Sequence, residues 1–260
     1  MKVRDIISAI ESFAPLSTQE EWDNSGLSVG SPDDEVHGVL VGFDCTPELI
    51  DEAAAGGFDM VVTHHPLIFR GLRKISPDDN VGLAIIKAVK AGISVYSAHT
   101  TADKAVGGVS WAFAERLGLG NIRILAGEGD GNTGLGVVGD FPEPLGAGEI
   151  AARLKKLFGV SVIRASRPTE NPIRRVAFCG GSGQSLIEDA LRAGAGLYIS
   201  ADISYHNFFT KEGFMIMDIG HFESEVQIAG IFVEEIRKKF PNFAVRLSDT
   251  LARSNPIYYY

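Results

Sequence analysis

The sequence predicts an α/β protein: two related α/β domains with mixed sheets covered by helices, the C-terminal segment returning to the first domain. Three observations support this class. Short apolar runs typical of strands alternate with amphipathic segments typical of helices, the pattern of a sheet covered on both faces. Thirty glycines suit the many tight connections of such a fold. The alternation restarts after the polar segment 127–133, which is predicted to be a linker.

The first domain is predicted to comprise residues 1–125 and 216–260. It begins with a helix at 3–13, whose isoleucines recur on one face and which ends before Pro15. A polar loop leads to the alternating region. That region is predicted to contain strands at 38–43, 59–63 and 93–97, with helices at 47–55, 81–91 and 105–117.

The second domain is predicted at residues 126–215. It is expected to contain strands at 135–140, 160–165, 175–178 and 197–200, with helices at 148–158 and 186–193. A strand at 214–219 and a long helix at 222–239 would then return the chain to the first domain. An edge strand is expected at 245–247.

Charge and composition argue against several classes of function. The formal net charge is −9 and no run of five or six basic residues occurs, which disfavours nucleic acid as a partner. Cys45 and Cys179 are far apart and form no CxxC pattern, so neither a thiolate zinc site nor a redox pair is expected. No apolar stretch long enough for a membrane span and no signal peptide is recognised, so a cytoplasmic location is expected.

Potential metal ligands gather at the ends of three predicted strands. Four of the six histidines fall at these ends, together with two acidic residues. In open α/β sheets, ligands bind beyond the carboxyl ends of the strands. We therefore predict a site for two divalent metal ions. Its predicted ligands are His64, His65, Asp103, His221 and Glu225.

The spacings of these residues suit a dinuclear site. Adjacent residues leaving a strand point in opposite directions, so His64 and His65 suit two different ions. His221 and Glu225 are four apart and share a helix face, and a carboxylate can bridge cations about 3.5–4 Å apart. Each residue alone has an ordinary interpretation, Asp103 as a helix N-cap for example. Their occurrence together at three strand ends favours the metal interpretation.

Further polar residues have two interpretations each. His99 is either a ligand or a hydrogen-bond partner of one. His206, after the strand at 197–200, would serve as an acid or base, or belongs to a polar surface loop. The glycine-rich segment 179–185 lacks the spacing of a nucleotide-binding motif and is favoured as a tight turn. Composition identifies the segment 22–27 only as a loop.

Five motifs together resemble one family over essentially the whole chain. They are EEWDNSGLSVG (20–30), VVTHHPLIF (61–69), SAHTTADKAVGGVS (97–110), YISADISYH (198–206) and GHFESE (220–225). They resemble the GTP cyclohydrolase 1 type 2 homologue family, also called the NGG-one-interacting-factor-three-like proteins, in the short form without an inserted middle domain. The resemblance implies a dinuclear metal site on the five predicted ligands, with Glu225 bridging. It also implies a ring-shaped homohexamer, a toroid built as a trimer of dimers.

The expected function is a metal-dependent hydrolase that acts on a small-molecule substrate, either a nucleotide or a related heterocycle. Two cations would activate water and polarise the substrate, and His206 or His99 would transfer protons. GTP cyclohydrolase activity is implied by the family name only. The alternative is a non-enzymatic metal-binding or scaffold protein that works as a hexameric ring. Imidazole and carboxylate ligands suit Zn, Mn, Fe, Co or Ni, so the sequence does not name the metal.

Overall fold

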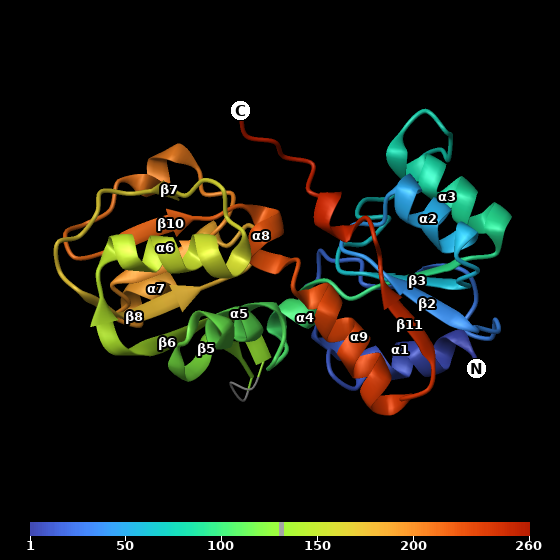
Figure 1. Ribbon diagram of the computed structural model, residues 1–260, viewed down its shortest axis with the longest axis horizontal. Helices are drawn as coiled ribbons and strands as arrows, with labels where there is room; N and C mark the ends of the chain where they lie inside the picture. The colour runs from blue at the N-terminus through green and yellow to red at the C-terminus, as the bar shows by residue number, and fades with distance from the viewer. Residues whose placement is uncertain (130–132) are drawn as a thin grey trace. The chain divides into compact units, whose positions relative to one another are not determined.

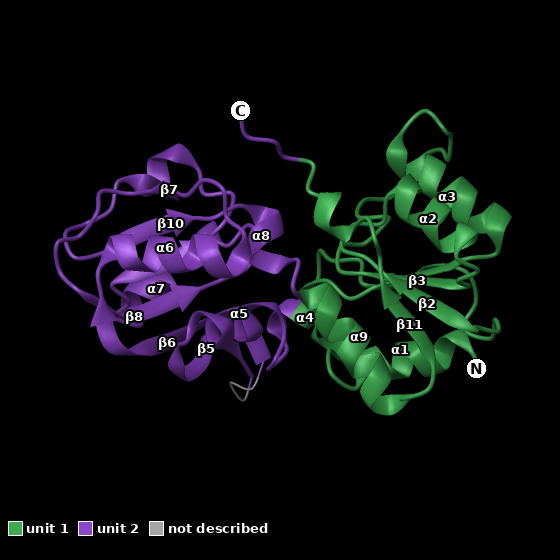
Figure 2. Cartoon of the chain, in the orientation of Figure 1, with its two compact units in different colours: residues 1–102, 228–256 green, residues 103–227, 257–260 purple. Residues whose placement is uncertain are grey.

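The computed structural model describes residues 1–129 and 133–260, which form two compact units (Figure 1). Unit 1 comprises residues 1–102 and 228–256, and unit 2 comprises residues 103–227 and 257–260 (Figure 2). Each unit has its own mixed sheet with helices, which confirms the predicted α/β class. None of the described helices is long and apolar enough to cross a membrane.

The sheet of unit 1 has five strands in the order β1-β4-β3-β2-β11. Their bounds are β1 Gly26–Val29, β2 Gly38–Val41, β3 Met60–Thr63, β4 Ser94–Ser97 and β11 Ala244–Leu247. All neighbours are parallel except β1, which runs antiparallel to β4. The carboxyl ends of β2, β3 and β4 therefore lie at one edge of this sheet, so residues that follow these strands are brought together.

Helices cover both faces of this sheet (Figure 1). They are α1 Val3–Glu11, α2 Pro47–Ala55, α3 Asn80–Ala91 and α9 Ile228–Lys239, with short 3-10 helices at Leu16–Thr18 and Leu251–Arg253. α2 and α3 pack together on one face, where Leu40, Val61 and Val95 of the strands meet Ile50 and Ile85 of the helices. α1 and α9 pack on the other face. The return of α9 and β11 to unit 1 confirms the predicted course of the C-terminal segment.

The sheet of unit 2 has six strands in the order β5-β6-β8-β9-β10-β7. Their bounds are β5 Gly120–Glu128, β6 Thr133–Leu145, β7 Arg164–Ala165, β8 Ile173–Phe178, β9 Leu197–Ser200 and β10 Met215–Asp218. The three strands β8, β9 and β10 are parallel, and the other pairs are antiparallel. Residues that follow the three parallel strands therefore meet at one edge, as in unit 1.

The helices of unit 2 bury both faces of its sheet. They are α5 Val109–Leu117, α6 Ala147–Phe158, α7 Ile187–Arg192 and α8 His221–Glu225, with 3-10 helices at Gln184–Leu186 and Tyr205–Phe208. The short helix α4, Thr100–Lys104, precedes α5 and contains the boundary between the two units. Phe113 of α5 and Ile150 of α6 belong to the core on one face, and Ala190 of α7 belongs to the core on the other.

The strand predicted at 214–219 lies in a different sheet from the one expected. β10 pairs with β9 and β7 in the sheet of unit 2, because Met215 and Met217 pack into that unit's core. The compact units consequently divide at 102/103 and 227/228, whereas the sequence led us to place the boundaries at 125/126 and 215/216.

Other segments also differ from the predictions: the strands β1 and β5 were not predicted, and the strand predicted at 160–165 is reduced to β7. The helix predicted at 222–239 is two helices, α8 and α9, because the chain passes from unit 2 to unit 1 between them. The helix predicted at 105–117 is shortened to α5, since a turn with Gly107 at φ +81° separates it from α4. The predicted linker 127–133 overlaps the ends of the paired strands β5 and β6, and its residues 130–132 lie outside the described residues.

Candidate metal centre

Three histidines cluster at the carboxyl edge of the sheet in unit 1. His64 and His65 directly follow β3, and His99 is the second residue after the neighbouring strand β4. One ligand atom from each histidine lies within 4.8 Å of the others. His64 is fully buried, and the other two are partly buried. Three imidazoles in this arrangement could hold a metal ion.

The orientation of His64 is set by a backbone carbonyl. Its Nδ1 lies 3.0 Å from the oxygen of Ala98. A carbonyl oxygen only accepts hydrogen bonds, so Nδ1 must carry the proton and Nε2 the lone pair. This tautomer presents Nε2 as the atom able to bind a metal. The ring is also held by Phe43, which stacks on it with a centroid separation of 5.7 Å.

Carboxylates orient the other two imidazoles in the same way. Nδ1 of His65 lies 2.7 Å from Oδ1 of Asp44, a residue that follows β2 at the same edge of the sheet. Nδ1 of His99 lies 2.8 Å from Oδ1 of Asp23. Each ionised carboxylate accepts only, so it favours the proton on Nδ1 and leaves Nε2 as the ligand atom.

Asp23 is the centre of a buried hydrogen-bond network. Its side chain is fully buried and also accepts hydrogen bonds from the backbone and hydroxyl of Thr100 and from the hydroxyl of Ser25. Burial acts to raise the pKa of Asp23, but the hydrogen bonds from His99 and Thr100 outweigh it and hold this pKa well below the ordinary value. Asp23 is therefore a permanent anion that fixes the ring of His99.

Unit 2 presents His221 and Glu225 on one face of α8, immediately after β10. Nε2 of His221 lies 3.0 Å from Oε2 of the buried Glu225, and Nδ1 lies 2.8 Å from Oδ2 of Asp202, which follows β9. Burial acts to lower the pKa of His221, but the two carboxylates outweigh it and raise this pKa to about 10. The 3.0 Å spacing suits two ligands of one ion, since bonds from zinc to nitrogen and oxygen are about 2.0–2.2 Å.

Two carboxylates of unit 2 lie near one buried thiol. Burial raises the pKa of Cys179, and the negative charges of Asp103 and Glu225 raise it further. Asp103 lies within α4 and is half-buried, so it is a helical residue and not an N-cap. A carboxylate oxygen of Asp103 lies within 4.8 Å of one of Glu225. Acidic side chains this close favour a bound cation, so these two residues could help to hold a divalent metal.

The glycine-rich turn after β8 makes room for these ligands. Gly181 has φ +56°, and a Cβ atom added there would lie 2.4 Å from Oε1 of Glu225 and 3.2 Å from Cε1 of His221. Its backbone N–H donates to the hydroxyl of Ser224, 2.9 Å away. The segment 179–185 is thus a tight turn, as favoured from its spacing, and its glycine permits the close approach of α8.

The ring contacts of His206 are with aromatic residues of its own segment. His206 lies in the 3-10 helix after β9, is exposed, and makes ring contacts with Tyr205 and Phe209 at 5.3 and 6.5 Å. A catalytic role for His206 stays a prediction. Sequence reasoning missed Asp23, Asp44 and Asp202 as orienting residues. Asp44 carried a usable signal, because it also follows an apolar strand, whereas Asp23 lies in a loop with no such pattern.

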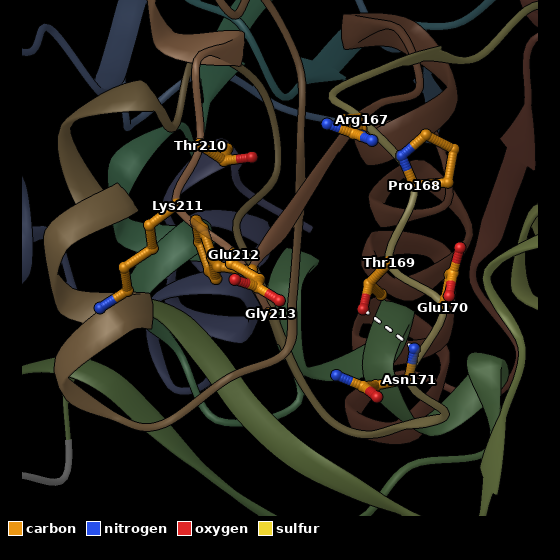
Figure 3. Close-up of a pocket in the computed structure, with 10 residues that line it drawn as sticks. Arg167, Pro168, Thr169, Glu170, Asn171, Thr210, Lys211, Glu212 and Gly213 are labelled. Carbon is orange, nitrogen blue, oxygen red and sulfur yellow. Dashed lines mark hydrogen bonds between the residues drawn. The ribbon is translucent and has the colours of Figure 1, made fainter.

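A separate open cavity of about 520 Å³ lies in unit 2 between two loops (Figure 3). The first loop is braced by a hydrogen bond from the backbone N–H of Asn171 to Oγ1 of Thr169, 3.1 Å long. None of the predicted ligands lines this cavity, so it is distinct from the candidate centre. Its lining residues are Arg167, Pro168, Thr169, Glu170, Asn171, Thr210, Lys211, Glu212, Gly213 and Phe214.

Comparisons with known proteins show similarity over nearly the whole chain. A family model described as Duf34/NIF3 (NGG1p interacting factor 3) matches residues 1–256. A GTP cyclohydrolase 1 type 2 homolog of Clostridium perfringens is 36% identical over 243 residues, which is 92% of each chain. A Bacillus cereus protein related to NIF3 superposes with a TM-score of 0.92 at 25% identity, covering 100% of this chain and 99% of the other. Reduced HcgD from Methanocaldococcus jannaschii superposes with a TM-score of 0.80 at 29% identity, covering 96% and 98%. As its motifs predicted, the chain belongs to the Duf34/NIF3 family.

Proposed function

We propose that this protein binds two divalent metal ions and is a metal-dependent hydrolase of a small-molecule nucleotide or related heterocycle. The ligands in this proposal are His64, His65, Asp103, His221 and Glu225. The main support for this proposal is the orientation of the histidine rings. Every one of the four histidines at the strand ends has its Nδ1 held by an oxygen atom, which directs Nε2 as the metal-binding atom.

The proposed ligands and the nearby histidines would have different roles in such a site. A pair of bound cations supplies Lewis acidity and lowers the pKa of water. Asp103 and Glu225 would help to hold the cations and would offset the repulsion between them, and the buried Glu225, which has two carboxylate oxygens, would serve both. His99 is held by the anionic Asp23 and is suited to transfer a proton to or from the substrate. His206 is the second candidate for that role.

The test is metal content measured on purified protein by elemental analysis. We expect close to two divalent ions per chain. Glu225→Gln should lose most of both, because one carboxylate serves each ion. Glu223→Gln is the matched control, since it changes an acidic residue of the same helix that is not a proposed ligand. Unchanged metal content in Glu225→Gln would refute the bridging role.

Turnover should be assayed with GTP, other nucleotides and phosphodiesters, with Zn and Mn supplied separately. His99→Ala should retain its metal and slow the reaction by about a hundredfold or more, the usual scale for acid–base groups. His206→Ala tests the second candidate in the same way. A protein that holds two ions but turns over none of these substrates would favour the non-enzymatic alternative.

A further inference from the structure

Two exposed aromatic side chains stand beside the histidine cluster of unit 1. Trp22 is 58% exposed and Phe69 is 45% exposed. Their ring centroids lie 6.0 Å apart, and those of Trp22 and Phe69 lie 5.9 and 6.0 Å from that of His99. All three pairs meet edge-on, at interplanar angles of 64–77°. Such packing leaves much of both aromatic surfaces available to a further ring.

The loop that carries Trp22 is firmly held. The next residue, Asp23, is bound to His99 and Thr100, as described above. The residue after it, Asn24, donates from Nδ2 to the carbonyl of Ile68 at 2.6 Å. That bond ties the loop to the residue preceding Phe69. The two aromatic side chains are therefore presented by segments that are bonded to each other and to the histidine cluster.

The segment after Phe69 is basic. Arg70 and Arg73 are both exposed, and neither forms an ion pair within residues 1–129 and 133–260. The chain as a whole carries a net charge of −9, so this segment is a local exception. Exposed guanidinium groups one and four positions after an exposed aromatic residue favour a ligand that combines a planar ring with a negative group.

We propose that Trp22 and Phe69 form a binding subsite for the planar aromatic ring of an anionic small molecule, with the anionic group toward Arg70 and Arg73. Aromatic side chains bind heterocycles through their faces with little dependence on the identity of the ring. This inference rests on the proposed function, since the ring would be held next to the candidate metal ligands. It narrows the substrate class to nucleotide-like molecules.

The experiment uses the emission of Trp22. The chain has two tryptophans, and Trp111→Phe leaves Trp22 as the only one. In that background, with metal content measured on the same samples, GMP, AMP and UMP should quench the emission saturably. Ribose 5-phosphate, which lacks the ring, should not. Guanosine, which lacks the phosphate, should bind more weakly than GMP.

Substitutions of Phe69 test whether nucleotide binding depends on stacking against its aromatic ring. Phe69→Leu should weaken GMP binding by about fivefold or more, the scale of a lost aromatic stacking contact, while Phe69→Tyr should preserve it. Both should keep the metal. Val89→Ala, at a 63% exposed apolar residue on α3, controls for general surface effects.

Two results would overturn the inference. One is metal-loaded protein whose Trp22 emission no nucleotide quenches; the proposed function would then still stand. The other is equal GMP affinity in Phe69→Leu and the parent. Absence of metal from the parent protein would instead contradict the proposed function itself, so the two failures are distinguishable.

Discussion

Gly181→Ala tests the candidate centre without removing any ligand. The new methyl group would lie 2.4 Å from Oε1 of Glu225, where ordinary contacts begin at 3.4 Å. The carboxylate must therefore move by about 1 Å. The new methyl group would also lie only 3.2 Å from Cε1 of His221. Displacement of this size is larger than a metal site tolerates, since ligands must be held to within about 0.5 Å.

Two separate costs follow from this substitution. Alanine in the left-handed region, at the φ of +56° that Gly181 adopts, costs about 1–2 kcal/mol of stability. Displacement of Glu225 should lower metal affinity by about 10- to 100-fold, the range seen when residues that support ligands are changed. The first cost is a property of the backbone, and only the second depends on the site.

Gly159→Ala is the matched control for the first cost. Gly159 also lies in unit 2, has φ +69°, and has nothing within 4 Å of an added Cβ. Both variants should lose stability in urea denaturation of the metal-free protein, Gly181→Ala more so because its methyl group also displaces Glu225, but only Gly181→Ala should lose metal in a competition titration with a chelator. Wild-type metal affinity in Gly181→Ala would refute the assignment of Glu225 as a ligand.

Three further predictions concern stability and assembly. Phe113 is fully buried between Phe178 and Phe158, at centroid distances of 3.6 and 4.0 Å, so Phe113→Ala should lower the free energy of unfolding by about 3–5 kcal/mol in urea denaturation. Burial acts to raise the pKa of Glu52, but hydrogen bonds, chiefly from Ser248, outweigh it and lower this pKa. The stability from this carboxylate is therefore present at neutral pH and lost as pH falls through the folded pKa, so Glu52→Gln should be destabilised at pH 7 and little different from wild type in strong acid; an equal difference at both pH values would contradict this. The family resemblance predicts a hexamer of 27.9 kDa chains. Light scattering coupled to size exclusion tests it, and a monomer at micromolar concentration would contradict the prediction.

Local signals predicted most of the elements but not the membership of every strand in a sheet. The strand at 94–97 and the helix at 80–91, closed by Gly92, were predicted almost to the residue because periodicity and helix termination are local properties. The sequence led us to assign β10 to the wrong sheet, because the residues of an apolar strand buried on both faces do not indicate which strand it pairs with. The sheet that a strand joins depends on the hydrophobic core into which its side chains pack.

The four histidines at the strand ends share one feature, an oxygen atom bound to Nδ1, and the residue that supplies this oxygen is distant in sequence in every case. Nδ1 of His99, His64, His65 and His221 is held by an oxygen that lies 76, 34, 21 and 19 positions away, respectively. A histidine after a strand is visible in the sequence, but its tautomer is set by whichever oxygen the fold brings to the other ring nitrogen. The sequence therefore indicates candidate metal ligands at the strand ends, whereas the orientation of each imidazole depends on a distant residue that only the fold brings to it, such as Asp44 after the parallel strand β2 or Asp23 in a loop.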